Sequence, residues 1–223
     1  MELSSTAELH ELIGYDPSSL PGTCFNRAIE AFKTISDKLS SHLFNYAIER
    51  FLKYASPHAN SMIYANCEER GGFISENLRL AVGNLIEALN FIKPFLCEQK
   101  FKKLFNQTLP EKLAAFMFQG VLLKNFFNQP GAERFHQDLQ YIQDTLNQVI
   151  DPGNLKSSFI KVFEAVEILK IKEKDPTGPF DGIRLSRAVK ENRVEELKRF
   201  LELLRLNHLR VDELSQIFAS RRS

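Results

Sequence analysis

The chain has 223 residues, of which 43% are hydrophobic and 26% are charged, as is ordinary for a soluble globular protein. Its 29 basic and 28 acidic residues give a formal net charge of +1. This balance argues against a dedicated nucleic-acid-binding protein and against electrostatic adhesion to anionic lipid, because both need a basic surplus. Three widely spaced cysteines indicate structural thiols in a reducing cytosol, and no apolar run approaches the ~20 residues of a membrane-spanning helix.

The first half of the chain predicts two long helices. Residues 1–22 are expected to be weakly structured and flexible, ending in a proline-rich loop. Apolar side chains then recur at helical spacing through residues 23–57, which predicts one long amphipathic helix. The pattern fails from 56 to 72, and a second helix is expected from Ser75 until Pro94 ends or kinks it.

Residues 98–128 form the third helical region, in which Pro110 either opens a new helix or kinks a single long one. After a corner at Gly131, residues 133–149 are amphipathic, and Asp151-Pro152-Gly153 is interpreted as a stop. Further helices are expected over 155–171, 183–190, 194–204 and 211–219.

No stretch shows the alternation of a strand, so the predicted fold is all-α. We expect an elongated bundle of long antiparallel helices, joined by proline and glycine corners, with a small C-terminal helical cap. The predicted divisions are a flexible N-terminal segment, a main bundle, a linker and the cap, over 1–22, 23–171, 172–182 and 183–223 respectively.

The corner between the third helical region and the next helix is the most informative stretch. Phe127 and Phe135 flank Asn128-Gln129-Pro130-Gly131, and we expect the two rings to meet across the turn as a structural clamp. Gly131 is expected to follow a helix end in the left-handed conformation, which glycine adopts most easily.

This stretch resembles a run in the closing helical domains of the RINT/TIP family, the endoplasmic-reticulum-side subunits of a tether that captures Golgi-derived retrograde vesicles. Residues 155–169 and 209–217 resemble the next and the final helices of the family, whereas 23–110 match only in pattern. The chain departs by carrying Gln129-Pro130 and by being far shorter than a whole family member. The family-like structural corner comprises Asn125, Phe126, Phe127, Asn128, Gly131, Ala132, Phe135 and Asp138.

The resemblance implies a CATCHR-type helical rod and a non-enzymatic interaction module in Golgi-to-ER transport. The implied partners are SNARE proteins or other tethering-complex subunits. The implied location is the cytoplasm, peripherally at the endoplasmic reticulum, with membrane contact only through partners. No nucleic-acid partner is expected.

The residues themselves predict no catalytic, cofactor-binding or metal site. His10-Glu11 begins like a zinc-protease helix, but Gly14 stands where the second histidine should be. No glycine-rich phosphate loop carries the Lys-Ser/Thr pair that a nucleotide needs, and no serine or cysteine lies in a nucleophile signature.

Two alternatives stay open, a helical regulator of small GTPases and an unrelated cytoplasmic adaptor. The first needs an exposed arginine at a helix corner, and Arg134 is the candidate. Phe116 and Phe118 lie two residues apart, so they cannot face the same side of one helix, and we expect Phe118 to be exposed or in a second contact. Phe118 and Arg134 are therefore the candidate partner contacts.

Overall fold

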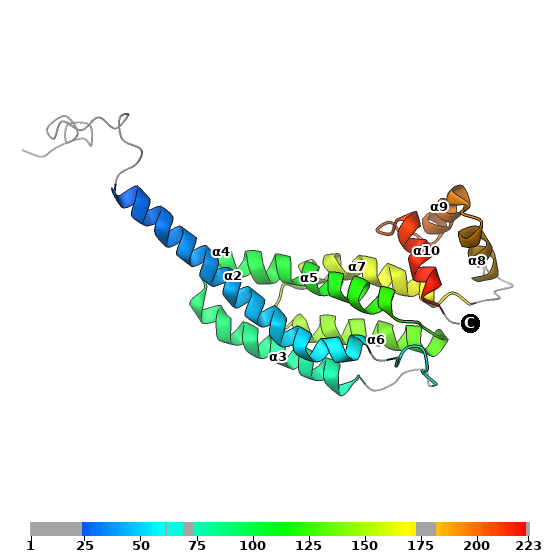
Figure 1. Ribbon diagram of the computed structural model, residues 1–223, viewed down its shortest axis with the longest axis horizontal. Helices are drawn as coiled ribbons and strands as arrows, with labels where there is room; N and C mark the ends of the chain where they lie inside the picture. The colour runs from blue at the N-terminus through cyan, green and yellow to red at the C-terminus, as the bar shows by residue number, and fades with distance from the viewer. Residues whose placement is uncertain (1–23, 61, 69–73, 173–181, 222–223) are drawn as a thin grey trace, which may run out of the picture. The chain divides into compact units, whose positions relative to one another are not determined.

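The computed structural model describes residues 24–60, 62–68, 74–172 and 182–221, and over these residues the protein is all-α, as predicted (Figure 1). The predicted N-terminal segment and most of the predicted linker lie outside this description. The helices are α2 (Cys24–Ala59), α3 (Glu76–Ile92), α4 (Glu98–Phe101), α5 (Leu109–Ala115), α6 (Gln129–Leu146), α7 (Pro152–Leu169), α8 (Gly182–Lys190), α9 (Val194–Leu203) and α10 (Val211–Ala219).

The chain divides into two compact units, and the boundary between Leu43 and Phe44 falls inside α2. In the described part of the first unit, the apolar stripe is open to solvent, with Phe25 74% and Phe32 72% exposed. In the second unit, α2 buries Phe51, which is 0% exposed and packs edge-on against another phenylalanine. The stripe that the sequence predicts is therefore a core face in only part of the helix.

Residues 98–124 form a nearly continuous helical region whose hydrogen-bond register changes several times. Two π-helical segments, Lys102–Thr108 and Phe116–Val121, flank α5, and the 3₁₀ turn Leu122–Lys124 ends the region. Pro110 lies in the first turn of α5, immediately after the first π segment. A proline has no N–H to donate to the preceding turn, so one regular helical hydrogen bond is missing at this point.

Both α6 and α7 begin earlier than the sequence predicts. The residues interpreted as interruptions between helices are in each case an N-cap followed by a first-turn proline. The Asn128 side chain accepts a hydrogen bond near the start of α6, and Asp151 does the same for α7. Pro130 and Pro152 occupy the first turns, where a missing N–H costs nothing. The predicted stop at 151–153 is therefore wrong, since it is the start of a helix.

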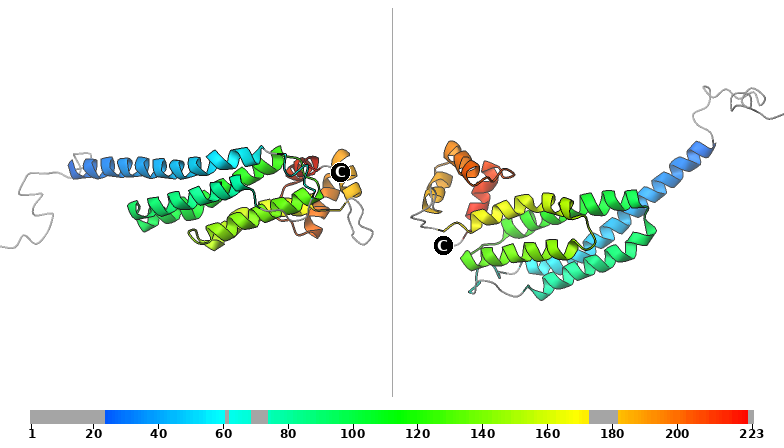
Figure 2. Two further views of the ribbon diagram at one scale, coloured as in Figure 1. Left: turned by 90° about the horizontal axis from the view of Figure 1, so that it is seen from below. Right: turned by 180° about the vertical axis from the view of Figure 1, so that it is seen from behind.

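The core of the second unit lies among α3, α5, α6 and α7, which run alongside one another in the right view of Figure 2. Phe105, Phe135 and Phe159 are fully buried there. Burying one such ring stabilises the fold by about 1.5–3 kcal/mol. No helix within the described ranges is long and apolar enough to cross a membrane.

The helices α8, α9 and α10 pack together and join the bundle through α7. Lys161 on α7 forms an ion pair with Glu213 on α10 at 2.6 Å. The Glu164 carboxylate accepts hydrogen bonds from the backbone N–H groups of Asn207 and His208, at 3.1 and 2.8 Å. These charge-assisted bonds hold the loop before α10 against the bundle.

Candidate functional site

The turn that leads into α6, called the α6 corner, is held to the loop that follows α2 by hydrogen bonds. Asn128 donates its backbone N–H to the Tyr64 carbonyl at 3.1 Å and its side-chain amide to the Cys67 carbonyl at 2.8 Å. Its side-chain oxygen accepts from the Gly131 N–H at 2.8 Å. Asn125 donates to the Ala59 carbonyl at 2.6 Å. Two asparagines therefore supply the backbone partners that an irregular loop lacks.

Gly131 is required by a close approach, and its backbone does not adopt the left-handed conformation that we expected. It lies within the first turn of α6 and has no positive φ. A Cβ atom at this position would lie 1.8 Å from the Tyr64 carbonyl oxygen, and backbone there has little room to move. The glycine lets the loop after α2 pass directly against α6.

Three aromatic rings fill the inside of the corner. The Phe127 and Phe135 ring centroids lie 5.4 Å apart, so the predicted meeting across the turn is confirmed. Tyr64 stacks on Phe127 at 5.0 Å and meets Phe135 edge-on at 5.3 Å. Tyr64 was not among the predicted site residues, and its signal was the short apolar run of residues 62–65 in the segment where the helical pattern fails.

A buried chain of hydrogen bonds starts from the Tyr64 hydroxyl, which donates to Asp138 Oδ2 at 2.7 Å. The hydroxyl also lies 2.7 Å from His58 Nε2, and His58 Nδ1 lies 2.7 Å from Ser75 Oγ. Burial, followed by the negative charge of Asp138, raises the pKa of Tyr64 well above its ordinary value.

This serine–histidine–carboxylate series has a structural role. Ser75 Oγ is already the N-cap of α3, accepting from the Leu78 N–H at 3.2 Å. His58 is 2% exposed and Asp138 is 0% exposed, whereas Ser75 at the end of the series is partly exposed. The bonds tie α2, α3 and α6 together around the corner.

The remaining predicted positions fall into different environments. Ala132 is fully buried, whereas Phe126 is 47% exposed on the outside of the corner. Arg134 is half-buried, with its positive charge acting on the Tyr64 hydroxyl. An arginine finger has to extend into a partner's site, and this side chain lies partly inside the protein.

Of the two expected environments for Phe118, the structure shows the second contact, since only 7% of the residue is accessible. Its ring lies beneath the Lys161 ammonium at 5.0 Å on one side of the helix, while Phe116 packs against Phe51 at 5.7 Å on another. Neighbouring helices cover both sides, so facing apart does not expose either ring.

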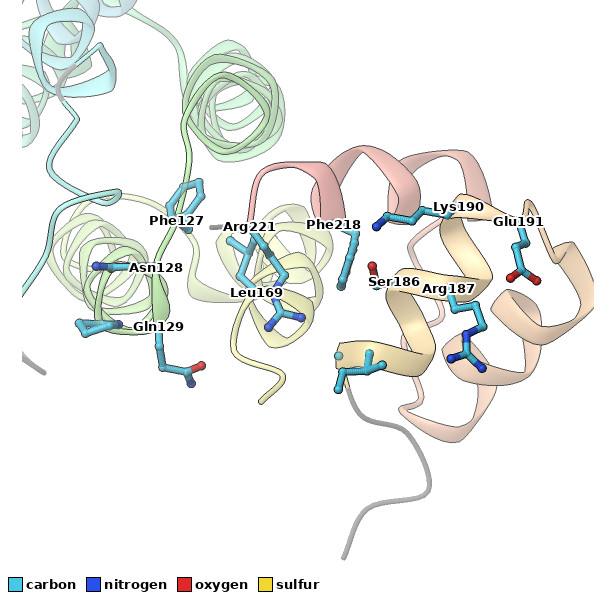
Figure 3. Close-up of a pocket in the computed structure, with 13 residues that line it drawn as sticks. Phe127, Asn128, Gln129, Leu169, Ser186, Arg187, Lys190, Glu191, Phe218 and Arg221 are labelled. Atoms are coloured by element: carbon cyan, nitrogen blue, oxygen red, sulfur yellow. The ribbon is translucent and has the colours of Figure 1, made fainter. Parts of the chain in front are cut away.

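A groove of about 710 Å³ lies between the outer side of the corner and the C-terminal helices (Figure 3). Residues 127–130 contribute from the corner, and Leu169 contributes from the end of α7. Its other residues come from α8, α10 and the segments next to them, namely Gly182, Ile183, Ser186, Arg187, Lys190, Glu191, Phe218 and Arg221.

The corner wall of the groove is held in place by the backbone and by Arg221. The Phe127 N–H donates to the Ser220 carbonyl at 2.8 Å, in a parallel bridge between segments far apart in sequence. Arg221 donates to the Ile171 carbonyl and stacks over Phe218 at 5.1 Å. Gln129 donates to the Lys170 carbonyl at 3.1 Å.

The α8 wall carries positive charge. Arg184, Arg187 and Lys190 recur every three residues along α8 and are exposed. Arg187 also lines a second recess between α8 and α9, together with Arg193 and Arg199. The sequence signal for this wall was the three-residue spacing, which places the side chains on neighbouring positions of one helix.

Comparison with known proteins places this geometry in a family. The model of the RINT-1/TIP-1 family matches residues 3–221. A similar solved structure is the crystal structure of the SNARE Sec20 bound to the Dsl1 complex subunit Tip20, with a TM-score of 0.71 at 16% identity. The match covers 96% of this chain and 37% of that chain, so this chain spans little more than a third of its neighbour. No curated protein matches the sequence.

Proposed function

The chain belongs to the RINT-1/TIP-1 family, and we propose that it is a non-enzymatic interaction module of a vesicle-tethering subunit in Golgi-to-ER retrograde transport. In this role it acts as a helical scaffold that contacts SNAREs or other tether subunits from the cytoplasmic side of the endoplasmic reticulum. The observation that carries the proposal is the family match, because it extends over nearly the whole sequence.

The structure of the second unit supports a role as a scaffold. A surface that transmits force between membranes needs fixed relative positions of its helices, and the corner supplies them through buried rings and hydrogen bonds. The Tip20 structure holds a bound SNARE, which makes a SNARE a reasonable partner class for this chain.

The experiment is a binding assay with the full chain immobilised through a terminal tag. Purified cytosolic regions of endoplasmic-reticulum SNAREs and the other tether subunits are applied one at a time, with an endosomal SNARE as control. We expect saturable one-to-one binding of at least one of the first set and none of the control. Absence of binding throughout that set would contradict the proposal.

The alternative of a GTPase regulator is tested with the same protein. Hydrolysis by small GTPases of the secretory pathway is measured with wild-type chain and with Arg134→Ala. We expect neither to change the rate, since Arg134 is partly enclosed beside Tyr64. An acceleration lost in Arg134→Ala would replace the scaffold proposal.

A further inference from the structure

The groove beside α8 combines an apolar surface with a positive rim. Ile183 is 44% exposed at the start of α8, and Phe218 of α10 is partly exposed, so apolar atoms are available to a ligand. Leu169 and Phe127 close the floor and are almost fully buried. A volume of about 710 Å³ is enough for several side chains of a partner.

Two basic side chains on the rim of the groove are not engaged in salt bridges. Among the described residues, neither Arg187 nor Lys190 forms a salt bridge. Figure 3 shows both on α8, across the groove from Arg221.

 
By contrast, Arg193 is paired with Glu191 and Glu196. Arg187 and Lys190 are therefore the basic groups of this wall that can pair with an incoming anion.

The charge of the C-terminal helices differs from that of the whole chain. Residues 182–221 hold nine basic and six acidic side chains, whereas the whole chain has a net charge of +1. The local surplus favours a negatively charged ligand. Its position beside an apolar floor favours a ligand that also carries a large apolar side chain.

We propose that this groove binds an acidic segment of a partner protein, with an apolar side chain against Ile183 and Phe218 and carboxylates beside Arg187 and Lys190. The inference rests on the proposed function, because it assigns the contact face and the chemistry of the partner segment. Burial of the apolar side chain contributes affinity, and the two charge pairs fix its register.

A protein segment fits the groove better than an anionic membrane. The apolar atoms lie in a recess between helices, which a flat lipid surface does not enter. Glu191 lies on the same rim, and Glu195 and Glu196 line the adjoining recess. These carboxylates repel a uniformly negative surface but leave room for a segment whose charges are spaced to avoid them.

The first experiment measures fluorescence anisotropy with three labelled peptides. One carries two leucines flanked by aspartates and glutamates, the second has serines in place of the leucines, and the third has glutamines in place of the acidic residues. We expect the first peptide to bind the full chain about tenfold more tightly than either of the others, because each loses one of the two contributions. Equal binding of all three would overturn the proposal.

Substitutions then locate the site. Arg187→Gln with Lys190→Gln is expected to weaken the acidic leucine peptide about tenfold, and Arg187→Lys with Lys190→Arg to restore it, because the second pair keeps the charges. The matched control is Lys103→Gln with Lys112→Gln, which removes two exposed charges that do not line the groove, one in α5 and one in the segment before it. An equal loss in the control would show a general charge effect and overturn the assignment.

Two further variants test the apolar surface of the groove. Ile183→Ser should weaken the same peptide, whereas Leu203→Ser, at an exposed position of α9 outside the groove, should not. Vesicles containing phosphatidylserine test whether the rim binds lipid instead. Binding of vesicles without binding of the peptide, abolished by Arg187→Gln with Lys190→Gln, would assign the rim to lipid and overturn the proposal.

The groove assignment and the proposed function can be contradicted separately. If a SNARE or tether subunit binds the wild-type chain and the Arg187→Gln, Lys190→Gln chain equally, the groove is not the contact face and the proposed function stands. If the acidic leucine peptide binds at the groove but none of those proteins binds, the groove assignment stands and the proposed function fails.

Discussion

The inside of the α6 corner and the groove on its outer side share Phe127 but differ in almost every other respect. The corner is closed by Tyr64 and Phe135, both 0% exposed, and the Asn128 side chain forms hydrogen bonds with the backbone around it. The groove has exposed charges without ion-pair partners among the described residues. Residues in the corner should therefore govern stability, and those in the groove should govern binding.

The largest expected effect comes from Gly131→Ala in the corner. The new Cβ atom would meet the Tyr64 carbonyl oxygen at 1.8 Å, so either the loop or α6 has to move. We expect a loss of at least about 5 kcal/mol in the free energy of unfolding, which is within reach of the whole stability of a domain. Urea denaturation measures it. Gly83→Ala is the control, since a Cβ there meets nothing within 4 Å, and it should stabilise α3 by about 0.5–1 kcal/mol.

The next effect is that of Phe135→Ala, which removes a fully buried ring between Tyr64 and Phe127. The expected loss is about 3–5 kcal/mol, from lost burial and the cavity that remains. Thermal and urea unfolding measure it, with exposed Phe126→Ala as the small-effect control. An unchanged melting temperature together with lost partner binding would make Phe135 a contact residue instead.

Tyr64→Phe tests the buried hydrogen bonds without emptying the corner. It leaves His58 and Asp138 without the hydroxyl between them, at an expected cost of about 1–3 kcal/mol. Tyr141→Phe, at a partly exposed position of α6, should cost less than about 0.5 kcal/mol.

The same variant has a pH signature. The pKa of Tyr64 is raised in the folded protein, so its hydroxyl keeps the proton when an unfolded tyrosine, with an ordinary pKa of 10.0, has begun to lose it. This contribution to stability is present below that pKa and is lost as the pH rises above it. Urea unfolding between neutral and alkaline pH should show a shallower alkaline loss for Tyr64→Phe than for wild type, and equal slopes would contradict the assignment.

The smallest effect on stability is expected in the groove. Arg187→Gln with Lys190→Gln should lower the free energy of unfolding by no more than about 1 kcal/mol, since exposed charges in a last helical turn contribute little. Circular dichroism during urea titration measures it. A loss as large as that of Phe135→Ala would show that these side chains stabilise the C-terminal helices, and the proposed separation between corner and groove would not hold.

Local sequence features predicted the helical segments well, because helical periodicity and capping act over a few residues. The stripe after Ser75 and the final three short helices are examples. The same local rules also contained the correct starts of α6 and α7. Asn128-Gln129-Pro130 and Asp151-Pro152 are N-cap and first-turn proline sequences, but glycine beside proline favoured the interpretation of a break.

The sequence by itself determined the all-α class, the family and the meeting of Phe127 with Phe135, because each follows from residues close together in the chain. Only the tertiary structure decided that Phe118 is covered and that the apolar stripe of α2 is exposed at Phe25 but buried at Phe51. It also brought Tyr64 against Gly131 and Arg221 beside Phe127. Burial depends on which distant segments arrive at a face, and periodicity within one helix carries no information about them.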